Sequence, residues 1–91
     1  MYKVSEGVRS THGQDGAIIL DIRQGQMFNL NFVGSRILEL LKAGTADRAI
    51  VDAISQEFGV RRDLVASDVE EFLGALAACH VLETQDSEAT I

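Results

Sequence analysis

The hydrophobic pattern of the chain changes its period once, close to residue 31. Before that point apolar and polar residues alternate in short segments, which is the period of β-strands. After it, apolar residues recur every three or four positions, as on one face of an α-helix. Strands grouped before helices predict an α+β fold, with the helices packed on one face of an antiparallel sheet.

Three strands are expected before the change of period. The first is a weak signal over residues 3–11, the second a β-branched segment at 17–22, and the third the sequence QMFNLN at 26–31. Glycine-containing turns separate them. Alternation divides the second strand into two faces, Ala17, Ile19 and Asp21 on one and Ile18, Leu20 and Ile22 on the other. In the third strand Phe28 and Leu30 share one face, and Met27 and Asn29 share the other.

Three helices are expected after the change of period. We predict Asn31, Thr45 and Asp63 as their N-caps. Gly44 and Gly59 would follow the first two helices, and the third would end near Cys79 with His80 in the left-handed region. The expected buried residues share the helical spacing and are Phe32, Val33, Ile37, Leu38, Leu40, Leu41, Ile50, Val51, Ile54, Phe58, Val65, Val69, Phe72, Leu73 and Leu76. Val81 and Leu82 are expected to fold back and add apolar surface to the core. We therefore predict a domain over 1–82 and a polar, disordered tail over 83–91.

Charge narrows the classes of function. The chain has 91 residues, enough for one domain, and a net charge of −6. Its one adjacent basic pair, Arg61–Arg62, is followed at once by Asp63. Affinity for nucleic acid needs a concentrated basic patch, so no nucleic-acid partner is expected. A winged-helix nucleic-acid-binding protein has the same number of elements and remains the alternative of a different class.

The sequence indicates no membrane partner and a cytoplasmic location. No apolar run approaches the roughly 18 residues that a membrane span requires, and the N-terminus MYKVSEGVRS has no signal-peptide core. The one cysteine, Cys79, cannot form an internal disulfide, which agrees with a reducing compartment.

No catalytic constellation is found, and we expect neither an enzyme nor a cofactor. Cys79 lies in an apolar helical stretch, and His80 beside it would point about 100° away around a helix. His12 lies in a turn far from other ligand-forming residues, so no metal site is expected. The acidic residues of the third helix are interpreted as a solvated face.

The segment QMFNLN is the candidate binding element. Proteins protect exposed strand edges with charges, proline or bulges, and this segment has neither charge nor proline. At the edge of the sheet it would accept a peptide strand through main-chain hydrogen bonds. The alternatives are that it is a central strand, that the chain's own terminus covers it, or that it pairs with itself in a homodimer.

Two long segments carry a resemblance to a known family. DGAIILDIRQGQMFNLNFVGSRILELLKAG, followed by FGV and DVEEFLGAL, resembles the PqqD-like family of recognition elements for precursors of ribosomally synthesised and post-translationally modified peptides (RiPPs). The resemblance extends from about residue 4 to residue 82. The positions that match the family pattern are Asp21, Gly25, Phe28, Leu30, Asn31 and Gly34. Met27, where an aromatic residue is common, and His80, where glycine is usual, depart from it.

The resemblance implies a winged-helix-like fold, with a three-stranded antiparallel sheet followed by three helices. It also implies that a precursor's leader peptide adds antiparallel to the third strand and packs against the third helix. The implied contacts are Met27, Phe28, Asn29 and Leu30 on the strand and Leu64, Asp68, Val69, Phe72 and Leu76 on the helix. Helical geometry puts Leu64, Asp68 and Ala75 along one margin of the core stripe and Ala66, Leu73 and Ala77 along the other; we expect the first margin to face the peptide.

The resemblance further implies an adaptor without catalytic activity. Its partners would be the leader peptide and an enzyme encoded nearby. That enzyme is a leader peptidase if the chain resembles the discrete recognition proteins of lasso-peptide clusters, which we favour. It is a radical SAM enzyme if the chain resembles the chaperone for the precursor of pyrroloquinoline quinone (PQQ). Arg23, Arg61 and Arg62 are the basic groups available to an acidic leader.

Overall fold

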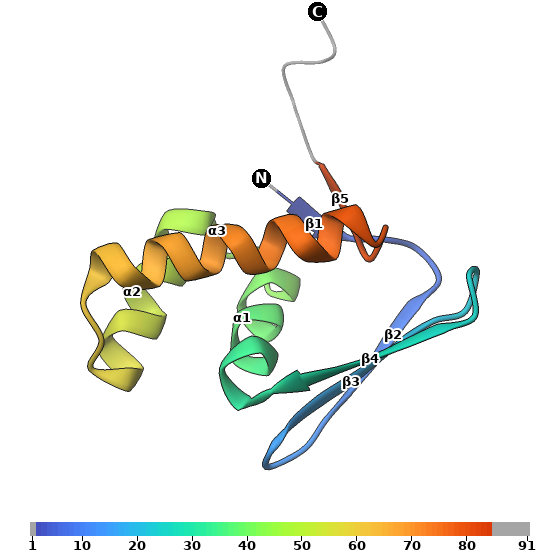
Figure 1. The fold of residues 1–91 in the computed structure, drawn as a ribbon, viewed down its shortest axis with the longest axis horizontal. Helices are drawn as coiled ribbons and strands as arrows, with labels where there is room; N and C mark the ends of the chain where they lie inside the picture. Colours follow the sequence, from blue (N-terminus) through green and yellow to red (C-terminus); the bar gives the residue numbers. More distant parts are fainter. Residues whose placement is uncertain (1, 85–91) are drawn as a thin grey trace, which may run out of the picture.

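The computed structural model describes residues 2–84. Along that range the elements are β1 (Tyr2–Val4), β2 (Val8–His12), β3 (Gly16–Asp21), β4 (Gln26–Asn31), α1 (Phe32–Lys42), α2 (Asp47–Phe58), α3 (Arg62–Ala78) and β5 (Leu82–Thr84). An antiparallel sheet of β2, β3 and β4 precedes the three helices, so the predicted α+β fold is confirmed (Figure 1).

The sheet is a simple meander with β3 in the centre. Val8 of β2 pairs with Asp21 of β3, and Asp21 pairs in turn with Gln26 of β4. The two hairpins therefore leave β2 and β4 as the outer strands of the sheet. This order answers a question that the sequence left open, because β4 is an edge strand.

The prediction of one strand over residues 3–11 is wrong in one respect, because the structure has two strands there, β1 and β2. Gly7 has φ +82°, a left-handed conformation that turns the chain between Val4 and Val8. As a result β1 leaves the main sheet and pairs with β5, with Tyr2 opposite Thr84. β5 was not predicted, and it includes the first two residues of the expected tail; the remainder of that tail, 85–91, lies outside the described residues.

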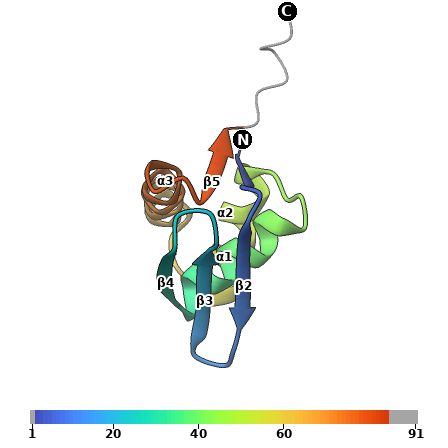
Figure 2. The ribbon, with the colours of Figure 1, turned by 90° about the vertical axis from the view of Figure 1, so that its right-hand side faces the viewer.

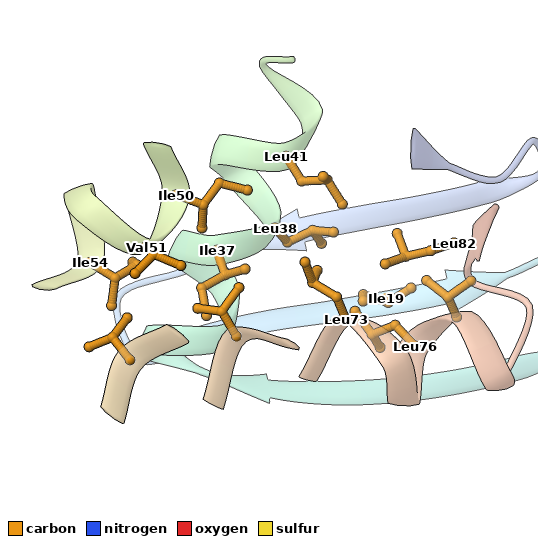
Figure 3. Packing of buried hydrophobic residues seen from close by; sticks show 13 residues of the cluster. Ile19, Ile37, Leu38, Leu41, Ile50, Val51, Ile54, Leu73, Leu76 and Leu82 are labelled. Carbon is orange, nitrogen blue, oxygen red and sulfur yellow. The ribbon is translucent and has the colours of Figure 1, made fainter. Parts of the chain in front are cut away.

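The core lies between the inner face of the sheet and the helices. Figure 3 shows Ile19 of β3 pointing toward Leu38 of α1 and Leu73 and Leu76 of α3. Most of the predicted core residues are buried, but Phe32 and Val33 are exposed, contrary to the prediction. Phe32, the first residue of α1, packs edge-on against Phe58, the last residue of α2, with 5.8 Å between the ring centroids.

The predicted helix ends are partly correct. Asn31 caps α1, since its side chain accepts a hydrogen bond from the Gly34 N–H at 2.8 Å, and His80 has φ +66° as predicted. The other two predicted N-caps are wrong. Thr45 precedes the N-cap of α2, which is Ala46, and Asp63 lies inside α3, whose N-cap is Arg61. Neither actual cap makes a side-chain hydrogen bond, because alanine has no polar side chain and the arginine side chain has no acceptor.

An ion pair ties α1 to α2. Arg36 donates hydrogen bonds to Glu57, from Nε to Oε1 at 3.0 Å and from Nη2 to Oε2 at 3.0 Å. These bonds lower the pKa of the Glu57 carboxyl below its ordinary value. Because the pKa of Glu57 is lower in the folded than in the unfolded chain, the pair contributes fully to the free energy of unfolding above the ordinary pKa of a glutamate. This contribution is lost as the pH falls through the lowered value.

Asp21 organises the turn that leads into β4. It is only 2% exposed, and its Oδ1 accepts the backbone N–H groups of Arg23 at 3.1 Å and Gln24 at 3.3 Å. Its Oδ2 accepts Gln24 Nε2 at 2.9 Å. The buried carboxylate therefore fixes the geometry of the β3–β4 connection.

We expect Asp21→Ala to lower the free energy of unfolding by about 2 kcal/mol, because it leaves two turn N–H groups without their acceptor. Urea denaturation followed by circular dichroism measures the loss. Asp15→Ala, in the exposed turn between β2 and β3, is the matched control and should cost less than about 0.5 kcal/mol. Equal losses for the two variants would contradict this role of Asp21.

Candidate functional site

The outward edge of β4 pairs with no other strand within residues 2–84. The backbone directions along β3 can be assigned from its turns. The Gly16 carbonyl accepts from Gly13 on the β2 side, whereas the Asp21 carbonyl accepts from Gly25 on the β4 side. Because backbone groups alternate in direction along a strand, Ala17, Ile19 and Asp21 present theirs to β4.

The register then assigns the backbone groups of β4. Leu30, Phe28 and Gln26 lie opposite those three residues of β3 and bond back to them. Met27 and Asn29 alternate with them, so their N–H and C=O groups point away from the sheet. We call this row of outward backbone groups the free edge. It is uncharged and free of proline over Gln26–Asn31.

The side chains of β4 point alternately to the inner and outer faces of the sheet. Phe28 and Leu30 point to the inner face, where they are half-buried and pack against the core. Met27 and Asn29 point to the outer face and are exposed. A strand added at the free edge would therefore place alternate side chains beside Phe28 and Leu30.

Helix α3 lies nearer to the β4 edge of the sheet than to the β2 edge (Figure 2). Of the helix residues named from the sequence, Leu64 and Asp68 are exposed and Phe72 is half-buried, whereas Val69 and Leu76 are in the core at 2% and 6% exposure. Phe72 lies close to the first turn of α1, which directly follows β4, since a Cβ added to Gly34 would come within 3.2 Å of its ring. Leu64, Asp68 and Phe72 thus keep surface available to a guest, and Val69 and Leu76 keep almost none.

The two margins of α3 differ in their surroundings. Leu64, Asp68 and Ala75 are exposed, whereas on the other margin Leu73 is buried and Ala66 is half-buried. Ala66 and Leu73 line a cavity of about 500 Å³ shared with α2 and Tyr2. The second margin therefore faces α2 and the N-terminal strand, and the expectation that the first margin faces the peptide remains a prediction.

The three arginines available to an acidic leader all have partners in the chain. Arg61 pairs with Asp63 at 2.8 Å, Arg62 pairs with Asp52, and Arg23 lies 3.8 Å from Glu6. An acidic guest would have to compete with these carboxylates.

A polar cluster between β2 and α1 was not found by sequence reasoning. His12 Nδ1 lies 2.8 Å from Ser35 Oγ, and His12 Nε2 lies 3.2 Å from Ser10 Oγ. Glu39 approaches the same Nδ1 at 3.6 Å, so it cannot orient the ring from the opposite nitrogen as in a catalytic triad. Ser35 is also buried, so the cluster is a packing contact. His12 and Ser35 are 23 residues apart in the sequence, so no local pattern indicates that they meet.

The described residues offer little to other kinds of site. Between residues 2 and 84 no group of three or more His, Cys, Asp or Glu side chains could hold a metal ion. None of the helices over that range is both long and apolar enough to cross a membrane.

Comparison with known proteins decides the family. Residues 16–82 match the family described as coenzyme PQQ synthesis protein D (PqqD). The chain belongs to the PqqD family. The family resemblance inferred from the sequence is thereby confirmed.

Solved structures of similar proteins agree with this assignment. A structure of TbiB1 in complex with the TbiA(beta) leader peptide is 41% identical to this PqqD-family chain, with a TM-score of 0.87; it covers 93% of this chain and 99% of its own. A lasso peptide synthetase B1 complexed with its leader peptide has 18% identity and a TM-score of 0.84, with coverages of 91% and 98%.

A third structure shares the fold. The PqqD truncation of Methylobacterium extorquens PqqCD, a stand-alone RiPP recognition element, has 20% identity and a TM-score of 0.76, with coverages of 91% and 88%. None of the curated proteins compared with this chain matches it.

Proposed function

We propose that this PqqD-family chain binds the leader segment of a ribosomally made precursor peptide by β-strand addition at the free edge of β4. It then presents the bound precursor to a leader peptidase or another modifying enzyme. The observation that carries the proposal is the free edge itself, where the N–H and C=O groups of Met27 and Asn29 point away from the sheet. The leader-peptide complex of TbiB1, at 41% identity, supports it.

The main-chain hydrogen bonds would supply affinity, and side chains would supply selectivity. Guest residues that face inward would pack against Phe28 and Leu30 from the strand and Phe72 from the helix, all three half-buried. Leu64 and Asp68 would meet the guest along the exposed margin of α3. In this proposal Val69 and Leu76 support the surface from below rather than contact the guest.

The proposal describes an adaptor without catalytic activity, formed by residues 1–82 and acting in the cytoplasm, where precursors are synthesised. We favour a lasso-peptide pathway over PQQ synthesis, because the sequence resembles the discrete recognition proteins of lasso-peptide clusters. The enzyme served would then be a leader peptidase rather than a radical SAM enzyme.

Amide hydrogen exchange tests the proposal at single residues. In the free chain we expect the amides of Met27 and Asn29 to exchange quickly, because they face solvent, and those of Phe28 and Leu30 slowly, because they bond to β3. Saturation with the leader of the neighbouring precursor gene should slow Met27 and Asn29 about 100-fold and leave Phe28 and Leu30 nearly unchanged.

A scrambled peptide of the same composition is the control and should change no amide. Protection confined to the loop between α1 and α2 would overturn the proposal. Steeply salt-dependent retention on heparin, without protection of β4, would instead favour the nucleic-acid-binding alternative. If the free chain has the mass of two copies and its Met27 and Asn29 amides are already protected, a homodimer occupies this edge.

A further inference from the structure

The outer face of the three-stranded sheet carries an apolar surface that the chain does not use for its own folding. The register defines two rows of neighbouring side chains, Arg9–Leu20–Met27 and Thr11–Ile18–Asn29. We call these six residues the outer face. Ile18 is 46% exposed, Leu20 43% and Met27 66%. Ile22, just beyond β3, extends the apolar surface toward the turn.

No helix or strand of the described chain lies over this face. The helices pack against the opposite side of the sheet, so that in Figure 2 the strands face the viewer with α1 and α2 behind them. Figure 1 shows the same sheet at lower right with nothing beyond it. A contiguous apolar surface on a small protein commonly marks an interaction site.

The outer face also differs in charge from the rest of the chain. The protein has 14 acidic residues and a net charge of −6, yet none of the six residues of the outer face is acidic, and Arg9 is the one charged member. This composition fits a partner surface that is apolar and carries a carboxylate opposite Arg9.

Met27 connects this surface to the peptide-binding edge. Its N–H and C=O groups lie on the free edge, and its side chain lies on the outer face beside Leu20. A guest strand on β4 would enlarge the sheet, and every second guest side chain would join the outer face next to Met27. A partner protein that covers the outer face would therefore contact both this chain and the bound peptide.

We infer that the outer face, completed by the outward side chains of the bound peptide, is the docking surface for the enzyme that processes the precursor. This inference rests on the proposed function and adds where the enzyme binds and why it prefers the loaded carrier. The apolar area is incomplete without the guest, so the enzyme binds the loaded form more tightly than the empty one. Met27 thereby serves two partners, one with its backbone and one with its side chain.

A second copy of the chain fits this surface less well. Self-association would bring two chains of net charge −6 together, and neither outer face offers a carboxylate to the partner's Arg9. An enzyme surface that contains a carboxylate satisfies Arg9 and buries the apolar rows.

Leu20→Glu tests the inference, because it puts a negative charge in the centre of the outer face without touching the free edge. Val60→Glu is the matched control, since Val60 is 41% exposed and lies in the connection between α2 and α3. Two quantities are measured on the full chain: affinity for the leader peptide, and affinity of the loaded chain for the purified processing enzyme encoded beside the precursor gene. For Leu20→Glu we expect leader affinity within about twofold of the original chain and enzyme affinity at least about tenfold weaker. Val60→Glu should change neither.

Each outcome separates the inference from the proposed function. If the original chain fails to bind the leader, the proposed function fails. If Leu20→Glu weakens leader binding, or if it leaves enzyme binding unchanged, the inference fails and the proposed function stands. A photo-crosslinking amino acid at position 20, in cells that produce the precursor, should form an adduct with the processing enzyme. An adduct with a second copy, or no adduct, would overturn the inference.

Discussion

Asn29→Pro is expected to weaken leader binding by about 30- to 100-fold while leaving the chain folded. The register places the Asn29 N–H on the free edge, where it makes no bond to β3. Proline at an outward-facing edge position costs the sheet little, because no ladder hydrogen bond is lost. In the complex, the guest carbonyl that would accept this N–H is left unsatisfied and meets the proline ring. That penalty amounts to about 2–3 kcal/mol.

Asn29→Ala is the matched control, because it removes the same side chain and keeps the N–H. We expect it to bind the leader within about threefold of the original chain. Isothermal titration calorimetry gives the affinities, and thermal unfolding confirms that both variants are folded. Equal affinity of the proline and alanine variants would mean that the guest pairs elsewhere, for example along β2.

Local pattern was sufficient to predict most of the fold. The alternation in 17–22 and 26–31 predicted β3, β4 and the faces of their side chains, and helical spacing predicted α1, α2 and α3. The missed features depend on residues far apart. β5 pairs with β1 from the opposite end of the chain, with Tyr2 opposite Thr84, and three-residue strands have no periodicity to detect.

The candidate site was predicted less completely, and the reason is geometric. Helical spacing places Leu64, Asp68, Val69, Phe72 and Leu76 near one another, but it cannot say which of them the rest of the chain covers. The structure buries Val69 and Leu76 and leaves Leu64 and Asp68 exposed. In the same way, alternation separates the faces of β3 but cannot show that Ile18 and Leu20 remain uncovered. Both questions are decided by how separate elements pack.

Gly16→Ala is expected to have the largest effect on stability, lowering the free energy of unfolding by about 3–5 kcal/mol. Gly16 has φ +152°, where side-chain-bearing residues are strained, and a Cβ there would lie 1.9 Å from the Leu30 carbonyl oxygen. That oxygen belongs to the backbone of β4, so the clash can be relieved only by moving the strand. Because small domains are stable by about 5–15 kcal/mol, this loss brings the chain close to unfolding.

Gly13→Ala is the matched control in the same hairpin, because a Cβ there has the Gly16 carbonyl oxygen as its nearest neighbour at 4.0 Å. It should change stability by less than about 1 kcal/mol, as measured by urea denaturation. If Gly16→Ala were as stable as Gly13→Ala, the close approach of Gly16 to Leu30 would be wrong, and with it the register at this end of β4. The register is what directs the Asn29 N–H outward, so this stability measurement also tests the geometry of the binding edge without any peptide present.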